Sequence, residues 1–255
     1  MPVRETEAII LRALPFNEAD KIVSFLSRGE GRTRGVAPNA RRSVKRFGAA
    51  LELMSHVRIR YQEHSARDLV RLESCELLDS FFDIQSRYEV TVASSYIAEI
   101  CEQLLPEREA NDPFFRLVLL VMTEIRRTGD IWRALTYFDL WAVKLAGFLP
   151  PLGDCIRCGE PLPAGEPAWF RPHWDGLLCK ACRATSGTLG GSQDAWSLSA
   201  ESRELANTML GAGLPSISQE KWSKERAEDL RRFLGQHIER HLERNLVTRR
   251  QLEAL

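Results

Sequence analysis

Four cysteines in two close pairs constrain this chain more than any other feature of its sequence. Cys155 and Cys158 form one Cys-x2-Cys pair, and Cys179 and Cys182 form a second after a spacer of twenty residues. Each short turn can direct two thiolates at one ion, and two such turns complete a tetrahedral shell. A redox pair instead requires the start of a helix in a βαβ unit, a setting that neither pair has. The spacing predicts one bound Zn²⁺ ion, with iron as the alternative for four thiolates.

The same pattern indicates a structural metal. Four cysteines leave no open coordination position for water or substrate. The spacer is rich in proline and glycine and predicts two short strands, at 168–172 and 173–178. A module of about thirty residues buries too little apolar surface to fold alone, so the metal would supply the missing free energy. We predict a zinc-binding module over residues 152–185, with His173 as the alternative ligand.

The first 80 residues predict a small β-barrel. Apolar residues alternate or cluster in five short segments, which are 5–14, 21–26, 32–37, 50–61 and 69–78. Two glycines in Ser27–Gly31 favour a hairpin between the second and third segments. Five short strands in this length favour a closed barrel of the OB type over residues 1–80. An SH3-like barrel and an open antiparallel sheet are the alternatives.

Beyond residue 80 the apolar residues recur at the three-to-four spacing of helices. We expect helices at 88–104, 114–128, 131–146, 199–211 and 219–246, with a flexible connector at Ser186–Ser192. The cysteine module would then be inserted in an α-helical domain formed by 81–151 and 186–255. The predicted fold class is α+β and multidomain, with the barrel, the helical domain and the inserted module.

Charge is distributed unevenly along a chain whose net charge is zero. Residues 28–46 hold seven basic residues against one acidic residue, and residues 221–250 hold nine against five. Basic side chains on a hairpin and its following loop can contact phosphates without reading bases. Phe47 adjoins the basic loop, and it could stack on a base or lie in the core. The alternative for the stretch itself is a solvated charged loop.

The sequence lacks the motifs of several enzyme classes. It has no GxxxxGK[ST] loop, no GxGxxG after a strand and no GxSxG elbow. His237 and His241 are four residues apart, but Glu239 does not directly follow the first histidine as a metalloprotease helix requires. We predict that the chain is not an enzyme, and a metal-dependent hydrolase is the least favoured alternative. No apolar run approaches the length of a membrane span, so we expect a cytoplasmic protein.

Several motifs in order resemble one family. They are Glu7–Arg12, Phe16–Lys21, Gly31–Ala37, Asn39–Arg42 and Phe47–Leu51, followed by the helical region with its cysteine insertion. This combination resembles the bacterial RecO recombination mediator family over nearly the whole chain, and the pattern is similar to the Deinococcus-type member. Pro38 and Asn39 are a departure, since the family often shows Lys and Gly there, so one expected positive charge is absent.

The resemblance implies an OB-fold, a helical domain and a structural zinc module. It implies a non-enzymatic DNA repair and recombination protein that binds single- and double-stranded DNA and anneals complementary strands. It also implies recombinase loading onto DNA covered by single-strand-binding protein, with a RecR partner, in the bacterial cytoplasm at the nucleoid. The basic residues that fit the family pattern are Arg32, Arg34, Arg41, Arg42, Lys45 and Arg46. The alternative function is a protein-interaction adaptor with incidental DNA affinity.

Overall fold

The computed structural model describes residues 3–43, 45–63, 69–172, 174–185, 195–217 and 220–255. The chain divides into two compact units, which we treat separately. The barrel unit is Met1–Ile131 with Leu246–Leu255, and the cysteine unit is Trp132–Asn245. The predicted three domains are a different division of the chain and stay a prediction. None of the helices in the described ranges is long and apolar enough to cross a membrane.

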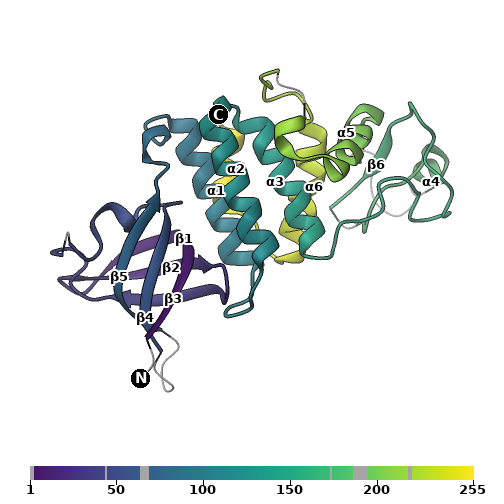
Figure 1. Ribbon diagram of the computed structural model, residues 1–255. Helices are drawn as coiled ribbons and strands as arrows, with labels where there is room; N and C mark the ends of the chain where they lie inside the picture. Colours follow the sequence, from purple (N-terminus) through teal and green to yellow (C-terminus); the bar gives the residue numbers. More distant parts are fainter. Residues whose placement is uncertain (1–2, 44, 64–68, 173, 186–194, 218–219) are drawn as a thin grey trace. The chain divides into compact units, whose positions relative to one another are not determined.

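Five strands of the barrel unit form a closed barrel in the order β1-β2-β3-β5-β4 (Figure 1). Only β3 and β5 pair in parallel, and the other neighbours are antiparallel. This confirms the predicted five-stranded barrel and the α+β class. The strands are β1 Val3–Phe16, β2 Asp20–Ser27, β3 Gly31–Ala37, β4 His56–Gln62 and β5 Val70–Asp79.

The first strand is long because it pairs with two neighbours in succession. Val3–Ile9 pair with β4, and Ala8–Phe16 pair with β2, with a register shift between Ile10 and Arg12. The predicted strand ended at Leu14, but the observed strand continues through Pro15 to Phe16. Proline has no N–H to donate, and it is tolerated here because only β2 borders this half of β1.

The barrel core is lined by the inward positions of all five strands and closed by a short helix. The 3-10 helix η1, Gly48–Leu51, contributes Ala50 and Leu51 to this core. Phe47 is 2% exposed in the same core, which excludes it from stacking on a base. The predicted strand at 50–61 is wrong in its first half, because η1 and the left-handed Met54 (φ 62°) precede β4.

Three α-helices and a second 3-10 helix complete the described barrel unit. They are η2 Phe82–Ile84, α1 Tyr88–Leu104, α2 Asp112–Thr128 and α7 Val247–Glu253. The Asn111 side chain accepts the Phe114 N–H at 3.1 Å and caps α2. The Glu99 carboxylate of α1 accepts the backbone N–H groups of Val247 and Thr248 at 2.9 and 2.8 Å. This contact holds the C-terminal helix against α1.

The cysteine unit brings together helices from both sides of the cysteine module. Its elements are α3 Ile131–Leu145, β6 Ala168–Phe170, α4 Lys180–Thr185, β7 Trp196–Leu198, α5 Ala200–Gly211, η3 Leu214–Ser216 and α6 Glu228–His241. The Trp141 indole of α3 donates to the carbonyl of Met209 on α5 at 3.2 Å. Arg231 of α6 donates to Thr136 of α3 at 3.0 Å. Helices before and after the module therefore pack on one another.

The single helix predicted at 219–246 is wrong. The structure has α6 at Glu228–His241 and α7 at Val247–Glu253 instead. Ala227 has a left-handed φ of 58°, which interrupts helical geometry just before α6. The segment before it buries Trp222, which is 2% exposed. Burial of this indole by tertiary packing prevails over the helical propensity of the segment.

Candidate functional site

The four predicted metal ligands converge on one point. The Sγ atoms of Cys155, Cys158, Cys179 and Cys182 all lie within 4.8 Å of one another. The Sγ atoms of Cys158 and Cys179 are 4.0 Å apart. A zinc–sulfur bond of about 2.3 Å in a tetrahedron separates two sulfurs by roughly 3.8 Å. The cluster therefore fits one tetrahedral ion coordinated by four thiolates.

Local backbone geometry positions each cysteine pair. Gly159 donates its N–H to the Cys155 carbonyl at 2.8 Å and has a left-handed φ of 75°, which glycine adopts without strain. Cys179 directly precedes α4, and Cys182 lies in the first turn of that helix. The Ile156 N–H donates to the Leu177 carbonyl at 2.9 Å and joins the two turns. The pairs are thus held together by the backbone as well as by any bound ion.

Hydrogen bonds to sulfur favour a thiolate at Cys155. Burial raises the pKa of its thiol, but backbone N–H groups of Cys158, Cys179 and Arg157 outweigh burial and lower that pKa to about 6. The Cys179 N–H lies 3.4 Å from the Cys155 Sγ. Burial and the neighbouring cysteine sulfurs raise the pKa of Cys182 to about 12. One thiolate disfavours the next, and a divalent cation removes this penalty by neutralising their charge.

The cysteine module is anchored to the rest of its unit through β6. This strand pairs with β7, and Trp169 also exchanges backbone hydrogen bonds with Leu178. The return strand predicted at 173–178 does not form as a strand within the described residues: Leu178 makes a single antiparallel bridge to Trp169, whereas β7 pairs with all three residues of β6. Phe170 of β6 packs edge-on against Phe233 of α6 at 5.0 Å between ring centroids. His173 and the predicted connector at 186–192 lie outside the described residues.

The two histidines of α6 are occupied by packing. The His241 ring stacks on Phe148 with 4.2 Å between centroids. His237 lies edge-on to Phe233, and burial, followed by the nearby Arg240, lowers its pKa to about 4. Neither histidine belongs to the cysteine cluster.

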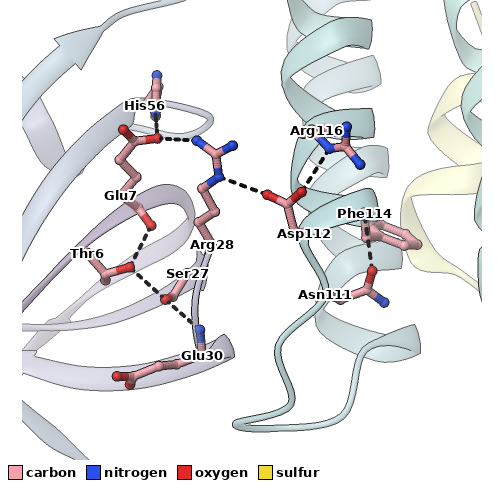
Figure 2. Close-up of polar contacts among 10 residues, drawn as sticks. All are labelled: Thr6, Glu7, Ser27, Arg28, Glu30, His56, Asn111, Asp112, Phe114 and Arg116. Atoms are coloured by element: carbon pink, nitrogen blue, oxygen red, sulfur yellow. Dashed lines mark hydrogen bonds and ion pairs between the residues drawn. The ribbon is translucent and has the colours of Figure 1, made fainter.

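The basic residues of the β2–β3 hairpin contact acidic residues of the same unit. Arg28 donates to Asp112 of α2 at 2.8 Å and to Glu7 at 3.2 Å, and Figure 2 shows it reaching from the barrel to the start of α2. Arg32 donates to Glu107 at 3.2 Å and to the Leu105 carbonyl at 2.9 Å. These cations anchor the hairpin to the start of α2 and to the segment between α1 and α2.

Arg34 shares its acidic partner with Arg32. Its Nε lies 2.7 Å from a Glu107 carboxylate oxygen, although its side chain is 48% exposed. The Arg32 side chain is only 16% exposed. Of the two arginines that pair with Glu107, Arg32 is therefore the less accessible, whereas Arg34 keeps an open face towards solvent.

The basic loop, residues 38–47, carries cations that are more exposed than those of the hairpin. Arg41, Arg42 and Lys45 are exposed and form no ion pair with any residue in the described ranges. The Arg41 N–H donates to the Ala19 carbonyl at 3.0 Å, and its guanidinium donates to the Glu18 carbonyl at 3.0 Å. The loop is therefore fixed to the β1–β2 turn while its charges stay available.

Arg46 has a mixed role at the end of this loop. Its guanidinium donates to the Pro38 carbonyl at 2.7 Å and lies 5.2 Å from the centroid of the Phe47 ring. Its carbonyl accepts the Cys75 N–H of β5 at 2.8 Å. Arg46 thus holds the loop closed, and its charge lies beside those of Arg42 and Lys45 in sequence.

The α6 arginines of the second basic stretch are engaged within the cysteine unit. Arg232 pairs with Glu228 at 2.8 Å, and Arg240 pairs with Asp175 at 2.6 Å. Arg231 donates to Thr136 and to the carbonyls of Arg226 and Lys224. This engagement makes α6 a weaker candidate than the basic loop for a phosphate-binding surface.

Sequence reasoning did not identify the acidic residues that form ion pairs with some of these cations. Glu107 and Asp112 lie more than seventy positions from the hairpin arginines Arg28 and Arg32 that they bind. The sequence shows where charged residues occur along the chain. It contains no signal for ion pairs between residues that only the tertiary fold brings together. Sequence reasoning also ended the first strand at Leu14 and so missed the outward side of β1 near Phe16. A search for period-two alternation through Pro15 would have found it.

Comparisons with known proteins place the whole chain in one group. The model described as Recombination protein O N terminal matches residues 1–81, and that described as Recombination protein O C terminal matches residues 85–250. DNA repair protein RecO of Koribacter versatilis is 43% identical over 99% of this chain and 99% of its own length. DNA repair protein RecO of Symbiobacterium thermophilum is 31% identical over 100% of this chain and 98% of its own length.

Proposed function

Because this chain belongs to the RecO family of DNA repair proteins, we propose that it binds single- and double-stranded DNA through the basic loop. On this proposal it anneals complementary strands and helps load recombinase onto single-stranded DNA covered by single-strand-binding protein, with a RecR partner. The carrying observation is the set of exposed cations at Arg41, Arg42 and Lys45, which have no ion-pair partner in the described residues. Their charges are the ones free to replace the counterions of DNA.

The physical basis is electrostatic. Two single strands repel each other through their phosphates, and a basic surface lowers this cost by releasing counterions. No covalent bond is made or broken during annealing, so no catalytic residue is required. The anchoring of the loop to the β1–β2 turn and to β5 supports the proposal, because a preordered loop loses little conformational entropy on binding. Arg34 and Arg46 would contribute beside the three exposed cations, with Arg32 in a supporting position.

The zinc module has a structural part in this proposal. The four thiolates would fill the coordination shell of one Zn²⁺ ion and stabilise the turns that carry Ile156 and Lys180. DNA contact is assigned to the barrel unit, so metal binding and DNA binding are separable properties. This separation is what distinguishes the proposal from a metal-dependent hydrolase.

The test compares two triple variants with equal loss of charge. Arg41→Gln, Arg42→Gln and Lys45→Gln remove the exposed loop cations, whereas Arg58→Gln, Arg60→Gln and Arg116→Gln remove cations that pair with Glu5, Glu76 or Asp112. Affinity for labelled oligonucleotides is measured from low to high salt. We expect the loop variant to lose about ten- to a hundredfold in affinity and to reduce the salt slope by about two to three. The control variant should keep both.

Annealing of complementary oligonucleotides is measured on the same three proteins. The wild-type protein should accelerate annealing without nucleotide hydrolysis, and the loop variant should not. A loop variant that keeps its affinity and salt slope would show that the loop is not the DNA contact. A wild-type protein that binds no DNA at low salt would instead favour the adaptor function, with protein partners in place of DNA.

A further inference from the structure

The four sulfurs of the cysteine cluster belong to residues that differ in their access to solvent. Cys155 is only 1% exposed, whereas Cys158 is exposed and Cys179 and Cys182 are half-buried. A reagent that approaches from solvent therefore meets Cys158 first. The susceptibility of a cysteine to oxidation follows its thiolate character and its exposure, and metal coordination keeps a thiol deprotonated. Cys158 is thus the member of the cluster most open to covalent modification.

A second sulfur lies close to that of Cys158. The Sγ atoms of Cys158 and Cys179 are 4.0 Å apart, and a disulfide brings two sulfurs to about 2.0 Å. The turn that carries Cys158 has room for this movement, because residues 156–161 are all exposed and a Cβ at Gly159 would contact nothing within 4 Å among the described residues. Cys155 is instead buried, and its Sγ accepts the Cys179 N–H at 3.4 Å. Cys158 and Cys179 are therefore a pair that can join.

Contacts that do not involve sulfur hold the two cysteine turns together. The Ile156 N–H donates to the Leu177 carbonyl at 2.9 Å. The Arg157 guanidinium donates to the Cys182 carbonyl at 3.3 Å and to the Thr185 hydroxyl at 3.1 Å. These bonds join the first turn to the residues before the second pair and to the end of α4. The sulfurs would therefore stay close to one another after loss of a bound ion.

We propose that the cysteine cluster is a reversible oxidation site for peroxides. Cys158 is the cysteine that is oxidised first, and Cys179 is the cysteine that joins it in a disulfide. Formation of this disulfide releases the structural Zn²⁺ ion, and reduction allows the ion to bind again. The inference goes beyond the proposed DNA-binding function and uses no residue of the basic loop.

The reaction balances with hydrogen peroxide as the oxidant. The Cys158 sulfur attacks one peroxide oxygen, so that an S–O bond forms, the O–O bond breaks and the departing hydroxide takes a proton to become water. The Cys179 thiolate then attacks the sulfenic sulfur of Cys158. An S–S bond forms, and a second hydroxide leaves and becomes water with another proton. The two sulfurs together lose two electrons, and the peroxide gains them.

Oxidation removes two of the four metal ligands. A disulfide sulfur no longer carries the negative charge that binds Zn²⁺, so only Cys155 and Cys182 would remain as ligands. Two thiolates do not complete a tetrahedral shell, and the module should lose its ion. Reduction restores the two missing thiolates in turns that Ile156 and Arg157 still hold together. The site should then bind zinc again without refolding of the whole module.

The test follows zinc and disulfides in the zinc-loaded full-length protein. Hydrogen peroxide is added in increasing amounts, released zinc is measured with a coloured chelator, and disulfides are mapped by mass spectrometry after alkylation of the remaining thiols. We expect release of about one zinc ion for each peroxide consumed, with Cys158 joined to Cys179. Cys75 and Cys101 are buried outside the cluster and should stay reduced as internal controls. Dithiothreitol with added zinc should restore the bound ion.

Arg157→Gln tests the reversal, with Arg183→Gln as its matched control. Arg157 bridges the two turns, whereas Arg183 is a cation next to Cys182 whose guanidinium lies 4.9 Å from the centroid of the Trp169 ring. After oxidation and reduction, Arg157→Gln should regain zinc about three- to tenfold more slowly than wild type, because its turns are less preorganised. Arg183→Gln should regain zinc at the wild-type rate.

Three results would overturn the oxidation site. The first is retention of zinc up to the peroxide dose at which circular dichroism shows that the protein unfolds. The second is a first disulfide that does not contain Cys158, and the third is loss of zinc that dithiothreitol does not reverse. Equal recovery rates in Arg157→Gln and wild type would overturn the bridging role of Arg157. A protein that binds no zinc would overturn this inference together with the metal site, and the DNA-binding proposal would stand.

Discussion

The barrel and the cysteine module are both small and rich in turns, but different forces hold them. The barrel encloses a continuous apolar core in which Phe25, Val57, Ile59 and Tyr61 are all fully buried. The module has short strands and turns around a cluster of four sulfurs. Burial stabilises the first region, and we expect metal coordination by the four cysteines to stabilise the second. The comparison teaches that damage to the fold and damage to nucleic-acid contact can be separated in this protein.

The largest expected effect is loss of the metal. Cys155→Ser removes one of four ligands, and structural Zn²⁺ contributes about 10 kcal/mol to the folding of small modules at neutral pH. We expect bound zinc to fall from one ion per chain to none and the module to become sensitive to protease, with oligonucleotide affinity within about twofold of wild type. Metal analysis, limited proteolysis and binding assays measure the three properties.

Cys101→Ala is the matched control for this prediction. Cys101 is a fully buried cysteine of α1 outside the cluster. Its replacement should leave metal content unchanged. If a stable Cys155→Ser protein lost DNA binding selectively, the separation between the two regions would be wrong.

The second effect concerns the barrel core. Phe25 is fully buried and packs against Tyr61 with 6.3 Å between ring centroids. Phe25→Ala should lower the free energy of unfolding by about 3–5 kcal/mol, because it leaves a cavity in a close-packed core. Chemical denaturation measures this loss, and zinc content should stay at the wild-type value. Phe25→Leu should cost less than half as much, and an equal cost would indicate that volume is not the cause.

The third effect is a loss of stability of the cysteine unit at acidic pH. Burial, and then Arg240, lowers the His237 pKa from 6.5 to about 4, while Asp175 acts in the opposite direction. The unfolded chain therefore binds a proton between pH 6.5 and 4 that the folded chain does not bind. Stability of the cysteine unit should fall as pH drops through this window, by about 3 kcal/mol at its lower end. Denaturation of wild type and His237→Gln across this range isolates the contribution, which should be missing in the variant.

The smallest effect lies in the barrel unit at more acidic pH. Arg126 donates two hydrogen bonds of 2.8 Å to the Asp79 carboxylate, and these bonds lower the pKa of Asp79 below 3.8. This stabilisation is present above pH 3.8 and is lost as pH falls through the folded-state pKa. Asp79→Asn should cost only about 0.5 kcal/mol at neutral pH, because both side chains are partly exposed and screened by solvent. A pH titration of unfolding should show this difference vanish once the pH has fallen below the folded-state pKa of Asp79, and persistence there would contradict the ion-pair origin.

Local sequence signals predicted much of the secondary structure. The helix at 88–104 was predicted with its observed bounds, and the helix predicted at 114–128 is observed at Asp112–Thr128, where Asn111 caps it and Pro113 lies in the first turn. These features depend on residues within a few positions of each other. The predictions that were wrong involve distant contacts. Burial of Trp222 replaced part of a predicted helix, and the strand that pairs along β6 is the distant β7.

The sequence by itself determined the ligand set of the candidate metal site, because three-residue spacing brings two sulfurs to one turn wherever the chain lies. It also determined the barrel strands, since period-two alternation separates core from surface. Only the tertiary structure decided which cations are free. Arg28, Arg32 and Arg34 meet Asp112 and Glu107 from distant parts of the chain, whereas Arg41, Arg42 and Lys45 form no ion pair within the described residues. The number of cations follows from the composition, but tertiary contacts decide which of them are available to a binding partner.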